Sequence, residues 1–174
     1  FDTLIDLNRA GVPLLEMVSE PEIRNSEEAY AYLTEVRKLV RYLEICDGNL
    51  EEGSMRCDAN ISVRKKGEAK FGTKVEVKNM NSIRNVQRAI EFEIDRQIAL
   101  LEEGKSILQE TRSFDAVKGT TFSLRSKEAA NDYRYFPEPD LETLLIEAHT
   151  IAAIQADMPP LPDELYQRFV EQYQ

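Results

Sequence analysis

Polar side chains that could hold a cation or a phosphate group alternate with apolar ones along residues 54–64. The polar members of this row include Arg56, Asp58 and Asn60, and residues 74–78 repeat the alternation with Glu76 and Lys78. Successive side chains of a β-strand point to opposite faces, so each row predicts a strand with one buried and one polar face. A hairpin joining the two strands would put both polar rows on one face, with side chains of neighbouring strands about 5 Å apart.

Two carboxylates at that separation could share a hard cation. Mg²⁺ is commonly held by one or two carboxylates together with water and phosphate oxygens, which makes Asp58 and Glu76 candidate metal ligands. Arg56 and Lys78 beside them could hold phosphates or neutralise developing charge. The pattern equally fits an ordinary solvated strand face with surface ion pairs. The alternation alone leaves both interpretations open.

Two further segments carry candidate functional residues. Residues 79–82 could cap a helix, or Asn79 could present its amide to a nucleotide, and the spacing fits either role. The segment 132–140 contains two prolines, which predicts a loop. Functional loops often carry the kinds of residue found here, and Asp132 and Arg134 are its candidates for exposed roles, whereas Phe136 is expected to anchor the loop to the core.

The elements that must position these residues follow from periodicity and from capping signals. Apolar residues at helical spacing predict one helix starting at Ser26, with a side-chain cap, and stopping near Gly48. They predict a longer helix from Ser82 to Gly104. Further predicted strands cover residues 3–7, 14–18, 107–114 and 120–125, and further helices cover 127–131, 151–156 and the chain from 163 onwards. We therefore expect an α+β fold, a largely antiparallel sheet with helices on one side.

A proline-rich turn at residues 158–162 is the expected domain boundary. It divides the chain into one domain at residues 1–157 and a linker with the start of a further helix at residues 158–174. The chain does not begin with Met, and its last residues break off inside a helical pattern. We therefore expect an excised segment of a longer protein.

Composition excludes several functional classes. The 174 residues are 42% hydrophobic and 31% charged, with a net charge of −10, which argues against a surface devoted to nucleic acid. No Walker loop or dinucleotide fingerprint is present. His149 is the only histidine, so a histidine-based triad is not expected. Cys46 and Cys57 lack metal-ligand spacing, and Cys57 falls on the apolar side of its strand, which fits a reduced, cytoplasmic setting.

Five motifs, in one order along nearly the whole chain, closely resemble the GatB family, the B subunits of the aspartyl/glutamyl-tRNA amidotransferases. They are LNRAGVPLLE at residues 7–16, VSEPEIR at 18–24, EEGSMRCDAN at 51–60, KNMNS at 78–82 and DYRYFPEPD at 132–140. The resemblance implies the catalytic (cradle) domain of that family, which is similar in fold to glutamine synthetase.

The resemblance also implies an activity. The family uses ATP and Mg²⁺ to phosphorylate the side-chain carboxylate of misacylated Glu-tRNA(Gln) or Asp-tRNA(Asn), and ammonia then displaces the phosphate. The ammonia comes from a separate amidase subunit, and a small third subunit holds the heterotrimer together. On this basis the isolated segment is expected to fold without being active, and most tRNA contacts are expected outside it or on a local patch.

The site residues follow from the motifs and the polar strand face together. Asp58 and Glu76 match acidic positions of the family's metal and phosphate site, and Glu16 is a weaker match of the same kind. The remaining candidates are Arg56 and Lys78 as catalytic residues, and Asn60, Asn79 and Arg134 as cofactor-binding residues. Two alternatives remain: a non-catalytic tRNA-binding or scaffold module, and an ATP-dependent carboxylate–amine ligase acting on a free small molecule.

Overall fold

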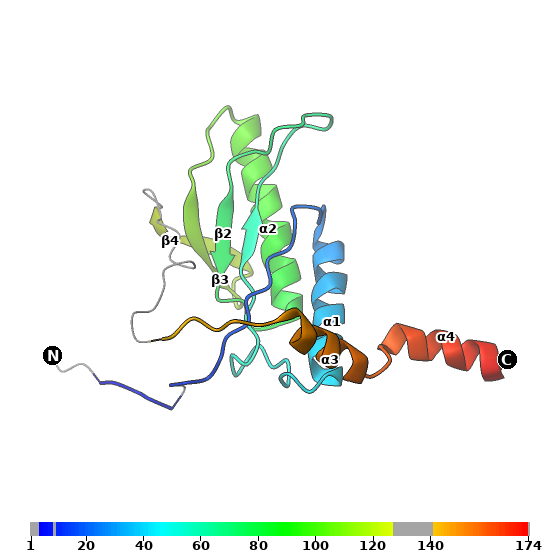
Figure 1. The fold of residues 1–174 in the computed structure, drawn as a ribbon. Helices are drawn as coiled ribbons and strands as arrows, with labels where there is room; N and C mark the ends of the chain where they lie inside the picture. The colour runs from blue at the N-terminus through cyan, green and yellow to red at the C-terminus, as the bar shows by residue number, and fades with distance from the viewer. Residues whose placement is uncertain (1–3, 9, 127–140, 174) are drawn as a thin grey trace.

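Residues 4–8, 10–126 and 141–173 are described by a computed structural model of the chain (Figure 1). In chain order the elements are α1 (Ser26–Tyr42), β1 (Ala59–Ile61), β2 (Val75–Lys78), α2 (Ile83–Glu102), β3 (Glu110–Asp115), β4 (Thr120–Ser126), α3 (Ala148–Asp157) and α4 (Pro162–Tyr173). The predicted α+β class is confirmed. The helix predicted at residues 127–131 and the loop at 132–140, which carries Arg134, lie outside the described residues.

The four strands form one mixed sheet in the order β1-β2-β3-β4. The outer pairs are antiparallel, whereas β2 and β3 run parallel. A parallel pair needs a crossover connection, and α2 provides it between β2 and β3. The sheet is therefore less antiparallel than the sequence predicts, because the chain returns along α2 to the free edge of β2.

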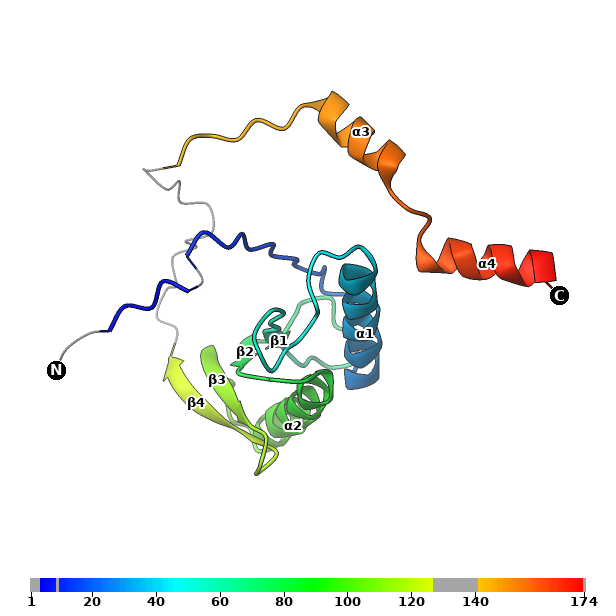
Figure 2. The same cartoon turned by 90° about the horizontal axis from the view of Figure 1, so that it is seen from below.

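Both long helices cover the same face of the sheet (Figure 2). The core lies in this layer and is built from Ala29 and Leu33 of α1, Val86 and Ala89 of α2, and Val77 of β2, among others. Val75 and Val77 are fully buried, and Met55, Cys57 and Ala59 pack against the core. The predicted apolar side of residues 54–64 is therefore confirmed, although the ladder of β1 covers only three of these residues. The opposite, polar face of the sheet is turned away from both helices.

The start of α1 differs by one residue from the sequence prediction. Asn25, rather than Ser26, is the N-cap, and its side chain accepts a hydrogen bond of 2.7 Å from the Glu28 amide. Ser26 is buried and donates from Oγ to Oε1 of Glu91 in α2 at 2.9 Å. The hydroxyl therefore joins the two helices instead of capping one of them. At its other end, α1 stops at Tyr42, several residues earlier than predicted.

The buried side of α2 is more polar than its apolar stripe predicts. Glu93 and Gln97 are fully buried there, whereas Ile98 and Leu101 are partly exposed. Arg96 donates two hydrogen bonds to the Glu93 carboxylate, at 2.9 and 2.7 Å, and Thr121 of β4 donates a third at 3.2 Å. These bonds satisfy a carboxylate that would otherwise be costly to bury.

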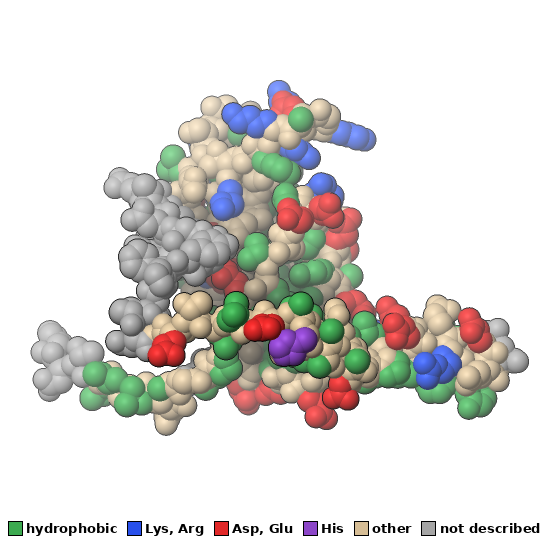
Figure 3. Space-filling view, in the orientation of Figure 1, with side chains coloured by type: hydrophobic (Ala, Val, Ile, Leu, Met, Phe, Trp, Pro, Cys, Tyr) green, Lys and Arg blue, Asp and Glu red, His purple; other side chains and the backbone are tan. Residues whose placement is uncertain are grey.

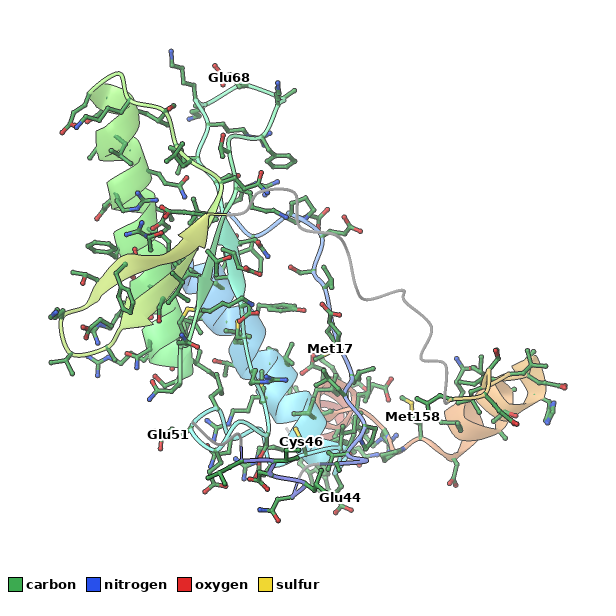
Figure 4. The ribbon with its side chains drawn as sticks, turned by 90° about the vertical axis from the view of Figure 1, so that its left-hand side faces the viewer. Met17, Glu44, Cys46, Glu51, Glu68 and Met158 are labelled. Carbon is green, nitrogen blue, oxygen red and sulfur yellow. The ribbon has the colours of Figure 1, made fainter. Side chains whose placement is uncertain are left out.

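The N-terminal segment contradicts the sequence prediction of two strands. Residues 4–8 and 10–23 contain no strand, and their apolar side chains, including Leu4, Leu14 and Val18, are exposed. An apolar run forms a strand only where a neighbouring strand pairs with it, and none of the described residues does so. Figures 2 and 4 both place this segment, which carries Met17, on the open side of the sheet, away from α1 and α2.

The C-terminal helices confirm the predicted helical segments, and both have no buried residues. Both stand apart from the sheet (Figure 2). The linker before α4 and α4 itself contact α1, since the Tyr42 hydroxyl donates to the Pro160 carbonyl at 2.6 Å and Lys38 lies 3.7 Å from Asp163. Among the described residues, no helix is long and apolar enough to cross a membrane. The division into domains at residue 157 stays a prediction.

Candidate functional site

The hairpin of β1 and β2 brings the two predicted polar rows onto one face. Its register pairs Ala59 with Val77 and Asn60 with Glu76. Because Ala59 and Val77 point into the core, Asn60 and Glu76 point to the open face, and Asp58 and Lys78 follow at the next positions. The segment that carries Glu16 also runs on this open side of the sheet.

Lys78 lies between the two predicted metal ligands. Its ammonium group donates a hydrogen bond to Oδ2 of Asp58 and lies 3.3 Å from Oε1 of Glu76. Burial lowers the pKa of Lys78, but the hydrogen bond and charge of Asp58, together with Glu76, outweigh this effect and raise the pKa. The ammonium therefore stays protonated and offsets part of the negative charge of the two carboxylates.

This arrangement also tests whether the residues fit Mg²⁺. Two carboxylates already converge on one cationic centre, the Lys78 nitrogen, and one or two carboxylates with water and phosphate oxygens are a usual magnesium environment. The donor chemistry fits the ion once the lysine side chain moves aside. Within the described parts of the chain, no group of three or more His, Cys, Asp or Glu could hold a metal. Glu16 therefore does not complete a three-carboxylate group with Asp58 and Glu76.

The polar face continues onto β3, where sequence reasoning named no site residue. Thr111 donates from Oγ1 to Oε2 of Glu76 at 2.9 Å, and Asn79 donates from Nδ2 to Oγ of Ser113 at 2.9 Å. The parallel pairing of Glu76 with Thr111 and Lys78 with Ser113 creates both contacts. The only sequence signal was that Thr111 and Ser113 alternate with Arg112 and Phe114. Thr111 holds one oxygen of Glu76, so it orients this carboxylate.

By its sequence, the segment 79–82 fits either a helix cap or a source of amide groups for a nucleotide, and Asn79 lies at its start. Its φ of +64° lies in the left-handed region, which asparagine tolerates better than most residues. Ser82, three residues later, caps α2 by accepting from the Asn85 amide at 3.1 Å. The helix-cap interpretation is therefore confirmed for Ser82, while Asn79 turns its exposed side chain to β3 at the end of the polar face.

Two other predicted residues on the polar side, Arg56 and Asn60, do not join this cluster. Arg56 and Asn60 are exposed on the polar side, and neither side chain forms a hydrogen bond or ion pair with any other residue that the structure describes. Glu16 is exposed in the irregular N-terminal segment. The structure thus brings together Asp58, Glu76 and Lys78 and adds Asn79 at the edge, whereas Arg134 lies outside the described residues.

Cys57 lies behind this face and is not arranged as a nucleophile. Its side chain packs against the core, and burial, with a smaller contribution from the charge of Asp58, raises its pKa to about 11. A thiol with such a pKa is protonated and unreactive near neutral pH. The prediction that Cys57 is a core residue is confirmed.

A separate hollow of about 560 Å³ lies between α1 and the start of α2. It is lined by Arg37, Arg41 and Arg84, but also by Asp47 and Glu51, so its charges largely balance. None of the predicted site residues that the structure describes lines it. Arg41 and Arg37 contribute to the lowered pKa of Asp47, after the hydrogen bonds from Asn49 and Ser54. The polar sheet face therefore remains the candidate site.

The family model for the GatB/GatE catalytic domain matches residues 2–152, which include the whole sheet and its polar face. The chain belongs to this family. The match confirms the resemblance that the five sequence motifs indicated, and it covers every predicted site residue.

Curated relatives of the GatB/GatE family extend the similarity to nearly the whole chain. The aspartyl/glutamyl-tRNA(Asn/Gln) amidotransferase B subunit of Alkalilimnicola ehrlichii is 60% identical over 171 residues, 98% of this chain and 36% of that protein. Its counterpart from Thioalkalivibrio sulfidiphilus is 60% identical over 169 residues, 97% of this chain and 35% of that protein. The counterpart from Thermodesulfovibrio yellowstonii is 55% identical over 171 residues, 98% of this chain and 36% of that protein. The chain thus spans just over a third of the length of these relatives.

Proposed function

We propose that the protein acts as the GatB subunit of a tRNA-dependent amidotransferase and activates the side-chain carboxylate of a misacylated Glu-tRNA(Gln) or Asp-tRNA(Asn). A carboxylate oxygen attacks the γ-phosphorus of ATP, ADP leaves, and an acyl phosphate forms. Ammonia then attacks the carbonyl carbon, inorganic phosphate leaves, and the amide results. A partner amidase subunit supplies the ammonia, and a small third subunit makes the complex a heterotrimer.

The observation that carries this proposal is the convergence of Asp58 and Glu76 on Lys78 at the open face. The reaction brings the phosphates of ATP to another anion, so the site must neutralise negative charge. Two converging carboxylates can hold a divalent cation, and together with the Lys78 ammonium that cation would neutralise the phosphates. Membership in the GatB/GatE family supports the same assignment.

The roles of the individual residues follow from their positions. Asp58 and Glu76 would hold Mg²⁺, with Thr111 fixing the orientation of Glu76. When bound, the ion neutralises phosphate charge and aligns the transferring group. The Lys78 ammonium, released from the carboxylates by the ion, would turn to the phosphate oxygens. Asn60 and Asn79 would donate amide hydrogens at the rim, and the exposed Arg56 would attract the anionic substrates. The roles of Glu16 and Arg134 stay predictions.

Two other functions would make different demands on this surface. A ligase for a free small molecule would need the cluster but not tRNA, and a scaffold module would need neither ATP nor the cluster.

The acyl phosphate chemistry would parallel that of glutamine synthetase, and we propose that the domain shares its fold. A cytoplasmic setting is proposed with the activity, since aminoacylated tRNA is its substrate.

The decisive experiment uses the full-length protein assembled with its partner subunits. Amidation of each misacylated tRNA is measured with ATP, Mg²⁺ and ammonium, and each component is then omitted in turn. We expect amide formation only with ATP, divalent ion and tRNA together. Amidation of free glutamate or aspartate at a comparable rate would favour the small-molecule ligase, and no ATP dependence at all would favour the scaffold.

A further inference from the structure

The loop between β1 and β2, residues 64–74 and here called the basic loop, concentrates positive charge in an acidic chain. Its ionisable side chains are Arg64, Lys65, Lys66, Lys70 and Lys74 against Glu68 alone, a local charge of +4 where the whole chain carries −10. All of these side chains are exposed. Figure 3 shows the lysine and arginine side chains gathered at this end of the molecule.

The basic loop has a defined shape. The Glu68 amide donates to the Lys65 carbonyl at 3.1 Å, closing a turn in which Gly67 has a φ of +92°. Arg64 donates to the Ala69 carbonyl at 2.6 Å, and its guanidinium carbon lies 4.4 Å from the centre of the Phe71 ring. A cation over an aromatic face is a stabilising contact. These contacts hold the turn of the loop in one shape and fix the Arg64 guanidinium on it.

The neck of the loop is also closely packed. A side chain at Gly72 would bring a Cβ atom 2.1 Å from the Val63 carbonyl oxygen, so only glycine fits this crossing. The two arms of the loop are thus held side by side where they leave the sheet. This geometry keeps the lysines pointing outward at the end of the hairpin.

The lysines of the basic loop are not balanced by acids of their own chain. Among the described residues, no carboxylate lies within 4.0 Å of the ammonium groups of Lys65, Lys66, Lys70 and Lys74. By contrast, Lys38, Lys105 and Lys118 on other elements each form an ion pair with a nearby acid. Unbalanced cations at a projecting tip favour binding of a polyanion, because binding releases condensed counterions.

We propose that the basic loop binds the phosphate backbone of tRNA near the aminoacylated end, an inference that rests on the proposed function. The loop leaves the end of the sheet opposite to the Asp58 and Lys78 cluster, and Glu68 marks its tip in Figure 4. Lys65 lies seven positions after Asp58, and a strand of that length reaches about 23 Å at most. A few nucleotides of RNA cover that distance, so a carboxylate at the cluster and phosphates at the loop can belong to one tRNA.

The chemistry of the loop favours RNA over an acidic protein surface. Phe71 is half exposed beside the Arg64 guanidinium, and such a pair offers both a stacking surface for a base or ribose and a cation for a phosphate. The flanking lysines supply contacts that carry no sequence information. Binding there is expected to position any tRNA rather than to select one.

The test measures tRNA binding by the full-length protein in its assembled complex, over a series of salt concentrations. The loop variant is Lys65→Ala/Lys66→Ala/Lys70→Ala, and the matched control is Lys38→Ala/Lys105→Ala/Lys118→Ala, which removes the same charge elsewhere. For the loop variant we expect the affinity for tRNA at low salt to fall by about tenfold or more. The slope of the logarithm of the association constant against log[salt] should become shallower by about 2 to 3, because each lost phosphate contact releases about one counterion fewer. The control should keep the wild-type slope.

A loop variant with wild-type affinity and slope would overturn the inference. So would dissociation of the complex with unchanged tRNA binding, because the loop would then contact a partner protein. The proposed function is judged separately by ATP-dependent amidation with the wild-type protein. If the wild-type protein amidates tRNA and the loop variant keeps the wild-type salt slope, only the inference about the loop is rejected. If the loop variant loses tRNA affinity but the wild-type protein shows no amidation, only the proposed function is rejected.

Discussion

The Nζ atom of Lys78 donates a hydrogen bond to Oδ2 of Asp58, although the two residues lie twenty positions apart in the chain. The antiparallel register of β1 and β2 produces this contact, and Glu76 joins it from the same strand as Lys78. The lysine thus occupies the centre at which a divalent cation was expected. The shared ammonium keeps the two carboxylates together in the absence of substrate.

Asp58→Asn and Glu76→Gln should each abolish carboxylate activation without unfolding the protein. Each substitution keeps the shape of the side chain and removes one charge from an exposed or partly exposed group. In the assembled complex, supplied with ATP and ammonium, we expect amidation to fall by orders of magnitude, because charge neutralisation carries much of phosphoryl transfer. Glutamine hydrolysis by the partner amidase should persist. Amidation at a near wild-type rate would remove that residue from the site and favour the solvated-face interpretation.

Glu93→Ala should destabilise the chain by about 3–5 kcal/mol, the usual cost of breaking a buried ion pair from one side. The substitution leaves Arg96 without the two hydrogen bonds that it makes to this fully buried carboxylate. Urea unfolding of the 174-residue chain measures the effect. Glu102→Ala, at the exposed end of the same helix, is the matched control and should change stability by less than about 0.5 kcal/mol. Equal effects of the two substitutions would contradict the account of the buried network.

Glu110 should make the chain less stable in acid. Burial raises its pKa, but hydrogen bonds from Ser123 and Arg112 and the charges of Arg112 and Arg96 outweigh burial and lower the pKa below the ordinary 4.5. A carboxyl group with a lowered folded-state pKa contributes stability above its unfolded pKa, and this contribution is lost as the pH falls through the folded value.

Urea unfolding of wild-type chain and Glu110→Gln between about pH 7 and pH 3 checks this expectation. The stability advantage of the wild type should be full at neutral pH and should shrink on acidification. Subtracting the free energies of unfolding of the two proteins at each pH removes the contribution that all other titrating groups make to both. An advantage that stays constant down to the lowest pH would show that the charge of Glu110 plays no part.

Cys57 should react slowly with thiol reagents in the folded chain. Its pKa of about 11, raised mainly by burial, leaves little thiolate at about pH 8. We expect the Cys46→Ser chain, which retains only Cys57, to react about tenfold or more slower than the Cys57→Ser chain, because the buried thiol of Cys57 forms so little thiolate. In urea the two rates should become similar. Fast folded-state labelling of Cys57 would mean that its strand does not pack as described.

Much of the candidate site could be predicted from local pattern. The alternation at residues 54–64 and 74–78 placed Asp58, Asn60, Glu76 and Lys78 on one polar face, and the hairpin register confirms that face. Periodicity also predicted both long helices, since the spacing of apolar residues reflects the turn of a single helix. Both features are set by residues close together in the chain, within one helix or one strand, and a sequence pattern carries information over that range.

Other features depended on where distant segments meet. The pairing of β2 with β3 brought Thr111 to Glu76 and Ser113 to Asn79, and only the path of α2 decides which sheet edge β3 joins. The packing of α2 on the sheet buries Glu93 beside Thr121 of β4 and Gln97 beside the Ile61 carbonyl of β1. The apolar N-terminal runs found no strand to pair with among the described residues. The sequence by itself determined the types of side chain and the faces they share. Only tertiary structure decided which polar groups neutralise one another, because hydrogen bonds and ion pairs act over a few ångströms between residues far apart in the chain.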